Sequence, residues 1–197
     1  LKTIGAYGCA YMYGTCAALT SVPNLAVEDI ARYGCYRTFY NCGKIATIGD
    51  LSAQSVAESG CQEMFHYNVG IASVGNLKAQ LLSKNACYRM FANHQSTSTV
   101  YYDVASITID QAGDSSCIEM FSAKAAGYSK LNNIPTIKVG GVGTRAFYNM
   151  FLYQSRMINV DTIQMGVVEP YGCQQMFNNS GVKKVNLIQS PRVKSYG

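Results

Sequence analysis

The amino-acid sequence predicts a mainly α-helical protein in which seven tandem repeats of about 26–30 residues pack as a single domain over residues 1–197. The first observation is a motif of Cys, two variable residues, Met and an aromatic residue that recurs along the chain. The second is that positions i, i+3 and i+4 share one face of a helix and not one face of a strand. The third is composition: 48% of the residues are hydrophobic and 14% are charged, which excludes an intrinsically disordered chain.

The copies of the motif begin at positions 9, 35, 61, 87, 117, 147 and 173, so the repeat has a shorter and a longer form, and the longer form is used twice in succession. All seven Phe residues lie within these copies. The repeats span approximately residues 7–32, 33–58, 59–84, 85–114, 115–144, 145–170 and 171–197. The motif side chains are the predicted repeat core: Cys9, Met12, Cys35, Phe39, Cys61, Met64, Phe65, Cys87, Met90, Phe91, Cys117, Met120, Phe121, Phe147, Met150, Phe151, Cys173, Met176 and Phe177.

The residues before each motif favour a helix. Small and apolar residues precede the motif at helical spacing and extend the apolar stripe on the same helix face. Before Cys61, for example, these are Gly60, Ala57, Val56 and Ala53. The four extra residues of the two longer repeats add about one helical turn, which returns the stripe to nearly the same face.

Segments 103–109, 135–139 and 162–168 are rich in β-branched residues, which favour strands. Pro170 interrupts a long helix in the sixth repeat. The alternative architecture is therefore an α/β solenoid with one short helix and one strand in each repeat.

The motif cysteines are expected in the core or in disulfides rather than at a metal. Cys and Met three residues apart are soft ligands of the kind that bind Cu(I). However, Phe147 replaces the Cys in one copy and Thr38 replaces the Met in another, which a packing position tolerates and a ligand set does not. Cys16 and Cys42 are the disulfide candidate, because both lie seven residues after the motif Cys in adjacent copies.

No catalytic constellation is evident, so the protein is not expected to be an enzyme or to require a cofactor. His66 and His94 follow motif copies and have no matching set of ligands or carboxylates nearby. The Gly-rich segment 139–145 lacks the Gly-Lys-Ser/Thr ending of a phosphate-binding loop.

The net charge of +5 is unevenly distributed. Residues 1–119 carry seven basic and nine acidic side chains, a net charge of −2, whereas residues 120–197 carry nine basic and two acidic ones, a net charge of +7. A basic half suits an anionic polymer such as an acidic polysaccharide. Lys183, Lys184, Arg192 and Lys194 are the candidate contacts. No nucleic-acid-binding motif is present.

The expected function is that of a secreted, non-enzymatic structural protein that self-associates in an extracellular material or coat, with acidic-glycan binding as the alternative. Eight Cys, fifteen Tyr and the low charge support this expectation. Asn178 begins an Asn-Asn-Ser triplet and is the candidate glycosylation site. No apolar run is long enough for a membrane span.

Overall fold

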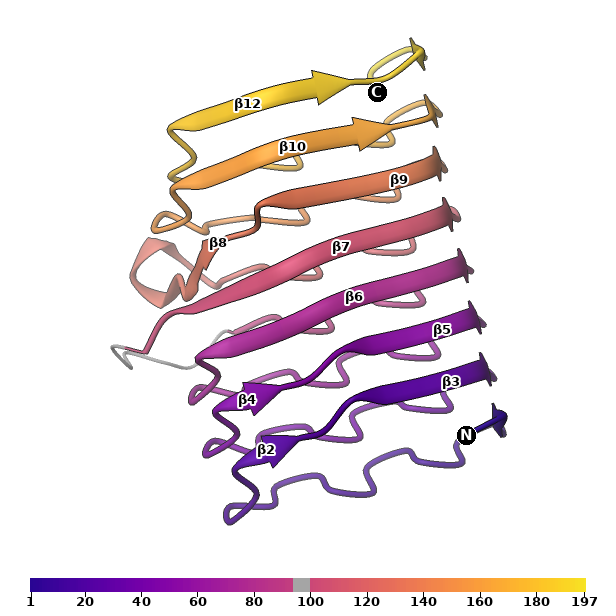
Figure 1. The fold of residues 1–197 in the computed structure, drawn as a ribbon, viewed down its shortest axis with the longest axis vertical. Coiled ribbons are helices and arrows are strands. Elements are labelled where there is room, and N and C mark those ends of the chain that lie inside the picture. The colour runs from indigo at the N-terminus through magenta and orange to yellow at the C-terminus, as the bar shows by residue number, and fades with distance from the viewer. Residues whose placement is uncertain (94–99) are drawn as a thin grey trace.

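The protein is a parallel β-solenoid of seven turns, here called coils, in the computed structural model, which describes residues 1–93 and 100–197 (Figure 1). Strand accounts for 36% of the residues and helix for 1%. The predicted helical repeats are therefore wrong, and so is the short helix that the alternative architecture placed in each repeat. Among the described residues, the helical structure is the 3-10 segment η1 (Ala126–Tyr128).

One face of the solenoid is a sheet in which neighbouring strands are parallel. Each coil contributes one long strand to it: β3 (Leu25–Ile30), β5 (Leu51–Val56), β6 (Ser73–Leu82), β7 (Tyr102–Ala112), β9 (Thr136–Val142), β10 (Asn159–Met165) and β12 (Lys184–Gln189). Shorter strands extend the pairing at the corners: β1 (Thr3–Ile4), β2 (Ser21–Val22), β4 (Thr47–Ile48), β8 (Leu131–Asn133), β11 (Val167–Val168) and β13 (Arg192–Val193).

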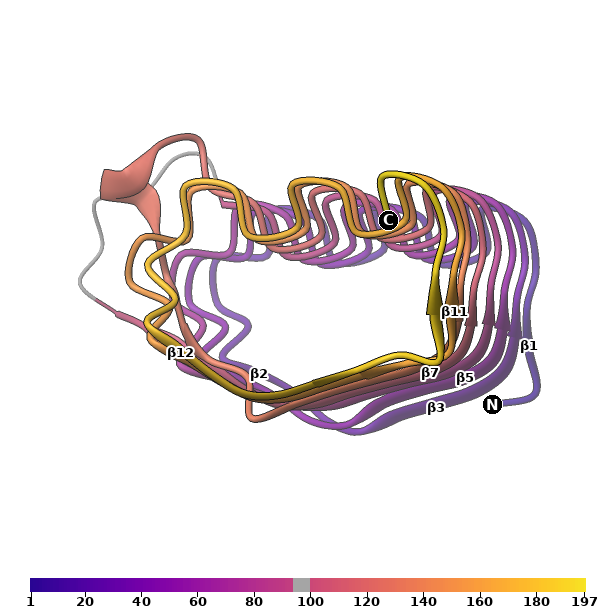
Figure 2. The ribbon, with the colours of Figure 1, turned by 90° about the horizontal axis from the view of Figure 1, so that it is seen from above.

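The strand register equals the repeat spacing of the sequence. Leu51 pairs with Leu77, an offset of one short repeat, and Ile107 pairs with Ile137, an offset of one long repeat. One repeat is therefore one coil. In the repeat at 115–144 the four extra residues lie in the corner that carries η1, outside the stacked faces (Figure 2).

The opposite face consists of seven stacked rows of β-turns, here called the turn rows: residues 7–16, 33–42, 59–68, 85–93, 115–123, 145–154 and 171–180. Within a row, turns close by i→i−3 hydrogen bonds; the Met64 N–H, for example, donates to the Cys61 carbonyl at 3.2 Å. Between rows, alternate N–H groups donate to the next coil, as from Phe65 to the Met90 carbonyl at 2.8 Å. Figure 2 shows the resulting waves above the flat strand face.

The turn rows explain why the motif resembles a helix. The repeating unit is four residues, and the first and fourth residues of each turn point into the solenoid. Positions i, i+3 and i+4, such as Cys61, Met64 and Phe65, are consequently all buried. A four-residue period and the helical period of about 3.6 are indistinguishable over a motif this short.

The third residue of each turn has a positive φ, near 55° at Tyr33, Asn85, Ser115 and Arg145. Asn and Ser tolerate this left-handed region better than most residues. No glycine in the described residues has a positive φ, so glycine does not mark these turns along the chain.

Candidate functional site

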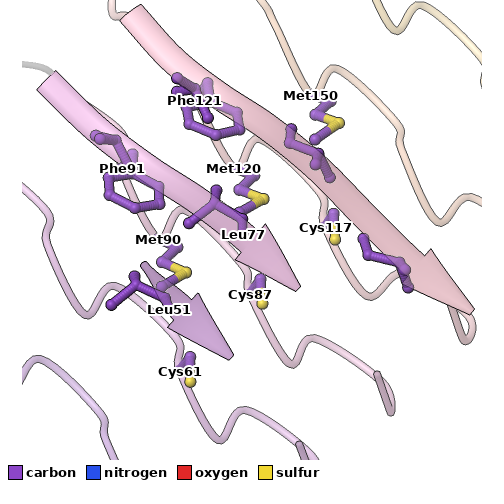
Figure 3. Close-up of a cluster of buried hydrophobic side chains, with 14 of the residues drawn as sticks. Leu51, Cys61, Leu77, Cys87, Met90, Phe91, Cys117, Met120, Phe121 and Met150 are labelled. Atoms are coloured by element: carbon purple, nitrogen blue, oxygen red, sulfur yellow. The ribbon is translucent and has the colours of Figure 1, made fainter. Parts of the chain in front are cut away.

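Equivalent side chains of successive coils stack in columns inside the solenoid (Figure 3). The turn rows contribute columns of Cys, Met and Phe, and the strands contribute columns of Leu and Ile. The predicted repeat-core residues lie in these columns. Buried are Cys35, Phe39, Cys61, Met64, Phe65, Cys87, Met90, Phe91, Cys117, Met120, Phe121, Phe147, Met150, Phe151 and Met176. Cys9, Cys173 and Phe177 are half-buried, and Met12 is 55% exposed.

The Phe column is a continuous stack of rings. Neighbouring ring centroids from Phe39 to Phe177 lie 5.1–5.5 Å apart, and the rings are within 13° of parallel. Tyr13 extends the stack into the first turn row at 5.3 Å. The spacing follows from the separation of about 4.8 Å between neighbouring strands. The rings from Phe39 to Phe151 are buried in the core.

The motif cysteines are free thiols. The Cys61 thiol donates to Cys35 and the Cys87 thiol donates to Cys117, and these hydrogen bonds together with burial raise the pKa of Cys61 and Cys87 well above the ordinary value. Protonated, buried thiols are poor nucleophiles and poor metal ligands. Cys61 and Cys87 are therefore not candidates for a catalytic cysteine. The hydrogen bond from Cys61 lowers the pKa of Cys35, but that thiol is buried in the core.

Cys16 and Cys42 lie at equivalent positions of adjacent turn rows, but the predicted disulfide is not formed. All eight cysteines are free. The Cys42 thiol donates instead to the carbonyl of Tyr13 at 2.9 Å. Burial raises the pKa of Cys42, which keeps this thiol in its unreactive form.

His66 is buried beside Glu63, with 3.3 Å between Nδ1 and the Glu63 Oε2 atom. Arg37 Nε donates to the same carboxylate at 2.6 Å, and Arg37 Nη1 donates to the Tyr11 hydroxyl at 2.8 Å. Burial raises the pKa of Glu63, but hydrogen bonds and charge from His66 and Arg37 outweigh burial and bring it to about 2. A carboxylate this acidic is a poor general base at neutral pH. His94 lies outside the described residues.

The structure does not gather the four predicted basic contacts into one patch. Lys183 and Lys184 lie at the start of β12, and Arg192 and Lys194 lie beyond its other end. Lys194 is already paired with Glu169, at 2.6 Å. Asn178 is half-buried in the last turn row. The Gly-rich segment 139–145 runs through β9 into a turn row and does not form a loop around an anion.

The outer side of the first turn rows is aromatic. Tyr7 stacks on Tyr33 with centroids 5.2 Å apart, and Tyr11 lies edge-on to Tyr36. The Arg37 guanidinium lies within 5.7 Å of the ring centroids of three tyrosines, which are Tyr11, Tyr36 and Tyr40. These contacts tie neighbouring coils together from outside.

The two ends of the solenoid expose side chains that are core elsewhere. Met12 is 55% exposed, whereas its equivalents Met64 and Met90 are each 5% exposed. Ile188, in β12, is 71% exposed, whereas Ile163 beneath it is 4% exposed. Met12 is one of the predicted repeat-core residues and is exposed instead, whereas Ile188 was not predicted as a core or site residue. Both occupy core positions of the repeat pattern that have no neighbouring coil to cover them.

The two ends of the solenoid differ in which backbone groups lack a hydrogen-bond partner. In the first turn row, the carbonyls of Gly8, Ala10, Met12 and Gly14 have no donor among the described residues. In the last complete row, the N–H groups of Cys173, Gln175, Phe177 and Asn179 have no acceptor there. One end therefore presents hydrogen-bond acceptors and the other presents donors.

No family model, curated protein or solved structure matches the chain. In the part of the chain that the structure describes, no group of three or more His, Cys, Asp or Glu side chains is placed to hold a metal ion. No helix in those residues is long and apolar enough to cross a membrane. The class that the structure defines is a tandem-repeat parallel β-solenoid.

Proposed function

We propose that the protein is a non-enzymatic structural protein that self-assembles head to tail, with the first coil of one copy stacked on the last coil of another. The observation that carries the proposal is the pair of complementary ends. Repeat proteins stay soluble as monomers when terminal repeats present a polar outer face. Here Leu1, Met12 and Tyr13 are exposed at one end, and Leu187 and Ile188 at the other.

The direction of the hydrogen bonds favours a head-to-tail junction. Between turn rows, N–H groups of the earlier coil donate to carbonyls of the later coil, as Cys9 donates to Gly34 and Phe151 to Met176. If a second copy continues this register, its Gly8, Ala10, Met12 and Gly14 carbonyls face the unpaired N–H groups of Cys173, Gln175, Phe177 and Asn179. A junction of two like ends would oppose donors to donors or acceptors to acceptors. Head-to-tail contacts of this kind generate open filaments rather than closed dimers.

Charge also disfavours a junction between two C-terminal ends. Residues 145–197 carry six basic side chains and two acidic ones, a net charge of +4. Residues 1–58 carry four of each and are neutral. In the head-to-tail arrangement, the C-terminal end with its charge of +4 meets a neutral end. In a junction of two C-terminal ends, it meets an equal charge and is repelled.

The C-terminal segment 190–197 must move if the first coil of a second copy stacks on the last coil in the register that neighbouring coils have. Ile4 pairs with Ile30 just as Val193 pairs with Val168, so residues 1–8 of one copy and residues 190–197 of the other belong at the same level. Residues 190–197 are held there by the two-residue strand β13, by the Lys194–Glu169 ion pair and by the stacking of Tyr196 on Tyr171. These contacts must break before the segment can leave its place, so we expect the segment to inhibit association. Its removal should strengthen association.

Sedimentation velocity over a range of protein concentrations tests the proposal. The wild-type chain is expected to form larger species as concentration rises. Met12→Glu and Ile188→Glu should each weaken association at least tenfold, because a charge would be buried in the junction without a partner. Leu81→Glu is the matched control, since Leu81 is 47% exposed on a middle coil. A wild-type chain that stays monomeric throughout contradicts the proposal.

A further inference from the structure

An apolar cavity of about 360 Å³ lies between the strand face and the turn rows in the N-terminal half of the solenoid. It extends across the four long strands β3, β5, β6 and β7, a distance of about 14 Å at the usual strand spacing. Aliphatic and sulfur-containing side chains provide most of its wall, among them Leu25, Ala53, Ala79, Cys61, Met64 and Met90.

The cavity results from a change in side-chain size along one inward-facing column. This column reads Val27, Ala53 and Ala79 in the first three long strands. It continues as Ile109, Val139 and Met165 in the next three, each of which is buried. Ile109 lines the cavity, whereas Val139 and Met165 do not. The larger side chains therefore close the cavity at its inner end.

The outer end of the cavity lies in the first coil. Leu1, Ile4 and Met12 line it there, and Leu1 and Met12 are 80% and 55% exposed. A ligand can thus enter along the solenoid axis, between the first turn row and β3. The slot is closed at one end and open at the other, and its lining is mainly apolar, with Asn24, Thr38, Ser52 and Lys78 as the polar members.

We infer that this cavity binds one unbranched hydrocarbon chain, inserted end-on so that its polar headgroup stays outside the first coil. A smaller engineered cavity, of about 150 Å³ and lined by similar side chains, stays dry and binds apolar molecules. A sugar or another polar ligand would leave most of its hydroxyl groups without partners, because the lining is mainly apolar. A slot extending over four strands suits a flexible linear chain better than a compact ring.

Dodecanoate and dodecanol are the probes, and isothermal titration calorimetry and native mass spectrometry are the measurements. Both probes are expected to bind with one molecule per protein chain and with similar affinity, because the tail is recognised and the headgroup is not. Octanoate should bind at least tenfold more weakly than dodecanoate, since it buries four fewer methylene groups. Binding of many molecules without saturation, or of dodecanoate but not dodecanol, overturns the inference.

The paired substitution Ala53→Ile and Ala79→Ile tests the position of the ligand. It places in β5 and β6 the residue that β7 already carries at this position, Ile109, and it should lower dodecanoate affinity at least tenfold. The thermal midpoint of the free protein should not fall, because the new side chains occupy empty space. The matched control is Gln54→Ile with Gln80→Ile, on the exposed side of the same strands, which should leave affinity unchanged. Equal binding by both double variants would show that the chain binds elsewhere.

The same titrations with the Ile188→Glu chain separate this inference from the proposed assembly. That substitution lies at the other end of the solenoid and leaves the lining intact. Its dodecanoate affinity should equal that of the wild type measured at low protein concentration. Loss of binding in Ile188→Glu contradicts a site in the first four coils, whatever the outcome of the sedimentation experiments.

Discussion

Glu63 shows how single residues hold neighbouring coils together. Its side chain, 8% exposed, accepts from Arg37 of the preceding turn row and contacts His66 of its own row. Its pKa of about 2 lies below the ordinary value of 4.5. A depressed pKa in the folded state means that the carboxylate stabilises the fold above pH 4.5 and that this contribution is lost as the pH falls from 4.5 towards 2.

Glu63→Gln is therefore expected to lower the free energy of unfolding by about 2 kcal/mol at pH 7. The difference from wild type should shrink at pH 3, where the wild type has lost part of the same contribution. Urea unfolding at the two pH values measures it. Glu58→Gln is the control, because the Arg32–Glu58 pair is exposed and such pairs contribute about 0–1 kcal/mol. An undiminished difference at pH 3 would contradict the role assigned to the Glu63 carboxylate.

Ser115 tests the positive φ of the turn rows. Its φ is 56°, where a β-branched side chain is strained and glycine is not. Ser115→Val should be less stable to urea than Ser115→Gly by about 1–2 kcal/mol. Asp103 is the control, because it is an exposed position in the extended strand β7. There the Gly variant should be no more stable to urea than the Val variant. Equal stability of the two Ser115 variants would contradict the left-handed backbone at this site.

The elements of this fold are columns and rows rather than separate helices or strands. Phe91 lies in the middle of the Phe column and is 3% exposed, whereas Phe177 at its end is half-buried. Phe91→Ala should cost about 3–5 kcal/mol of unfolding free energy, and Phe177→Ala at least about 1 kcal/mol less because part of that ring already contacts solvent. Chemical denaturation of both variants checks this gradient. Equal losses would contradict the stacked order of the column.

The repeat spacing was predictable from sequence, but the local structure was not. The motif positions predicted a short and a long repeat, and the strand register is offset by the same two lengths. The β-branched segments 103–109 and 135–139 contribute to strands β7 and β9. The helix prediction failed because stacked four-residue turns bury i, i+3 and i+4 as a helix does. Residues such as Tyr33 and Arg37 occupy the left-handed positions where Gly would have signalled a turn.

The open ends and the cavity are properties of the whole molecule, and they arise where the repeat pattern is interrupted. Met12 and Ile188 have ordinary core identities and are exposed because no coil covers them. Ala53 and Ala79 leave space because the equivalent residue in β7 is Ile109. Both features require comparison of the same position in successive coils, which becomes possible once the register is established.

Mixing two end-blocked chains tests the head-to-tail account most directly. Met12→Glu blocks the first coil and Ile188→Glu blocks the last, so neither variant alone should associate. Each variant retains one intact end, and the two intact ends are complementary. Sedimentation velocity of an equimolar mixture should show a 1:1 complex that does not grow further. A mixture that sediments as two monomers, or a single variant that dimerises alone, would contradict the account.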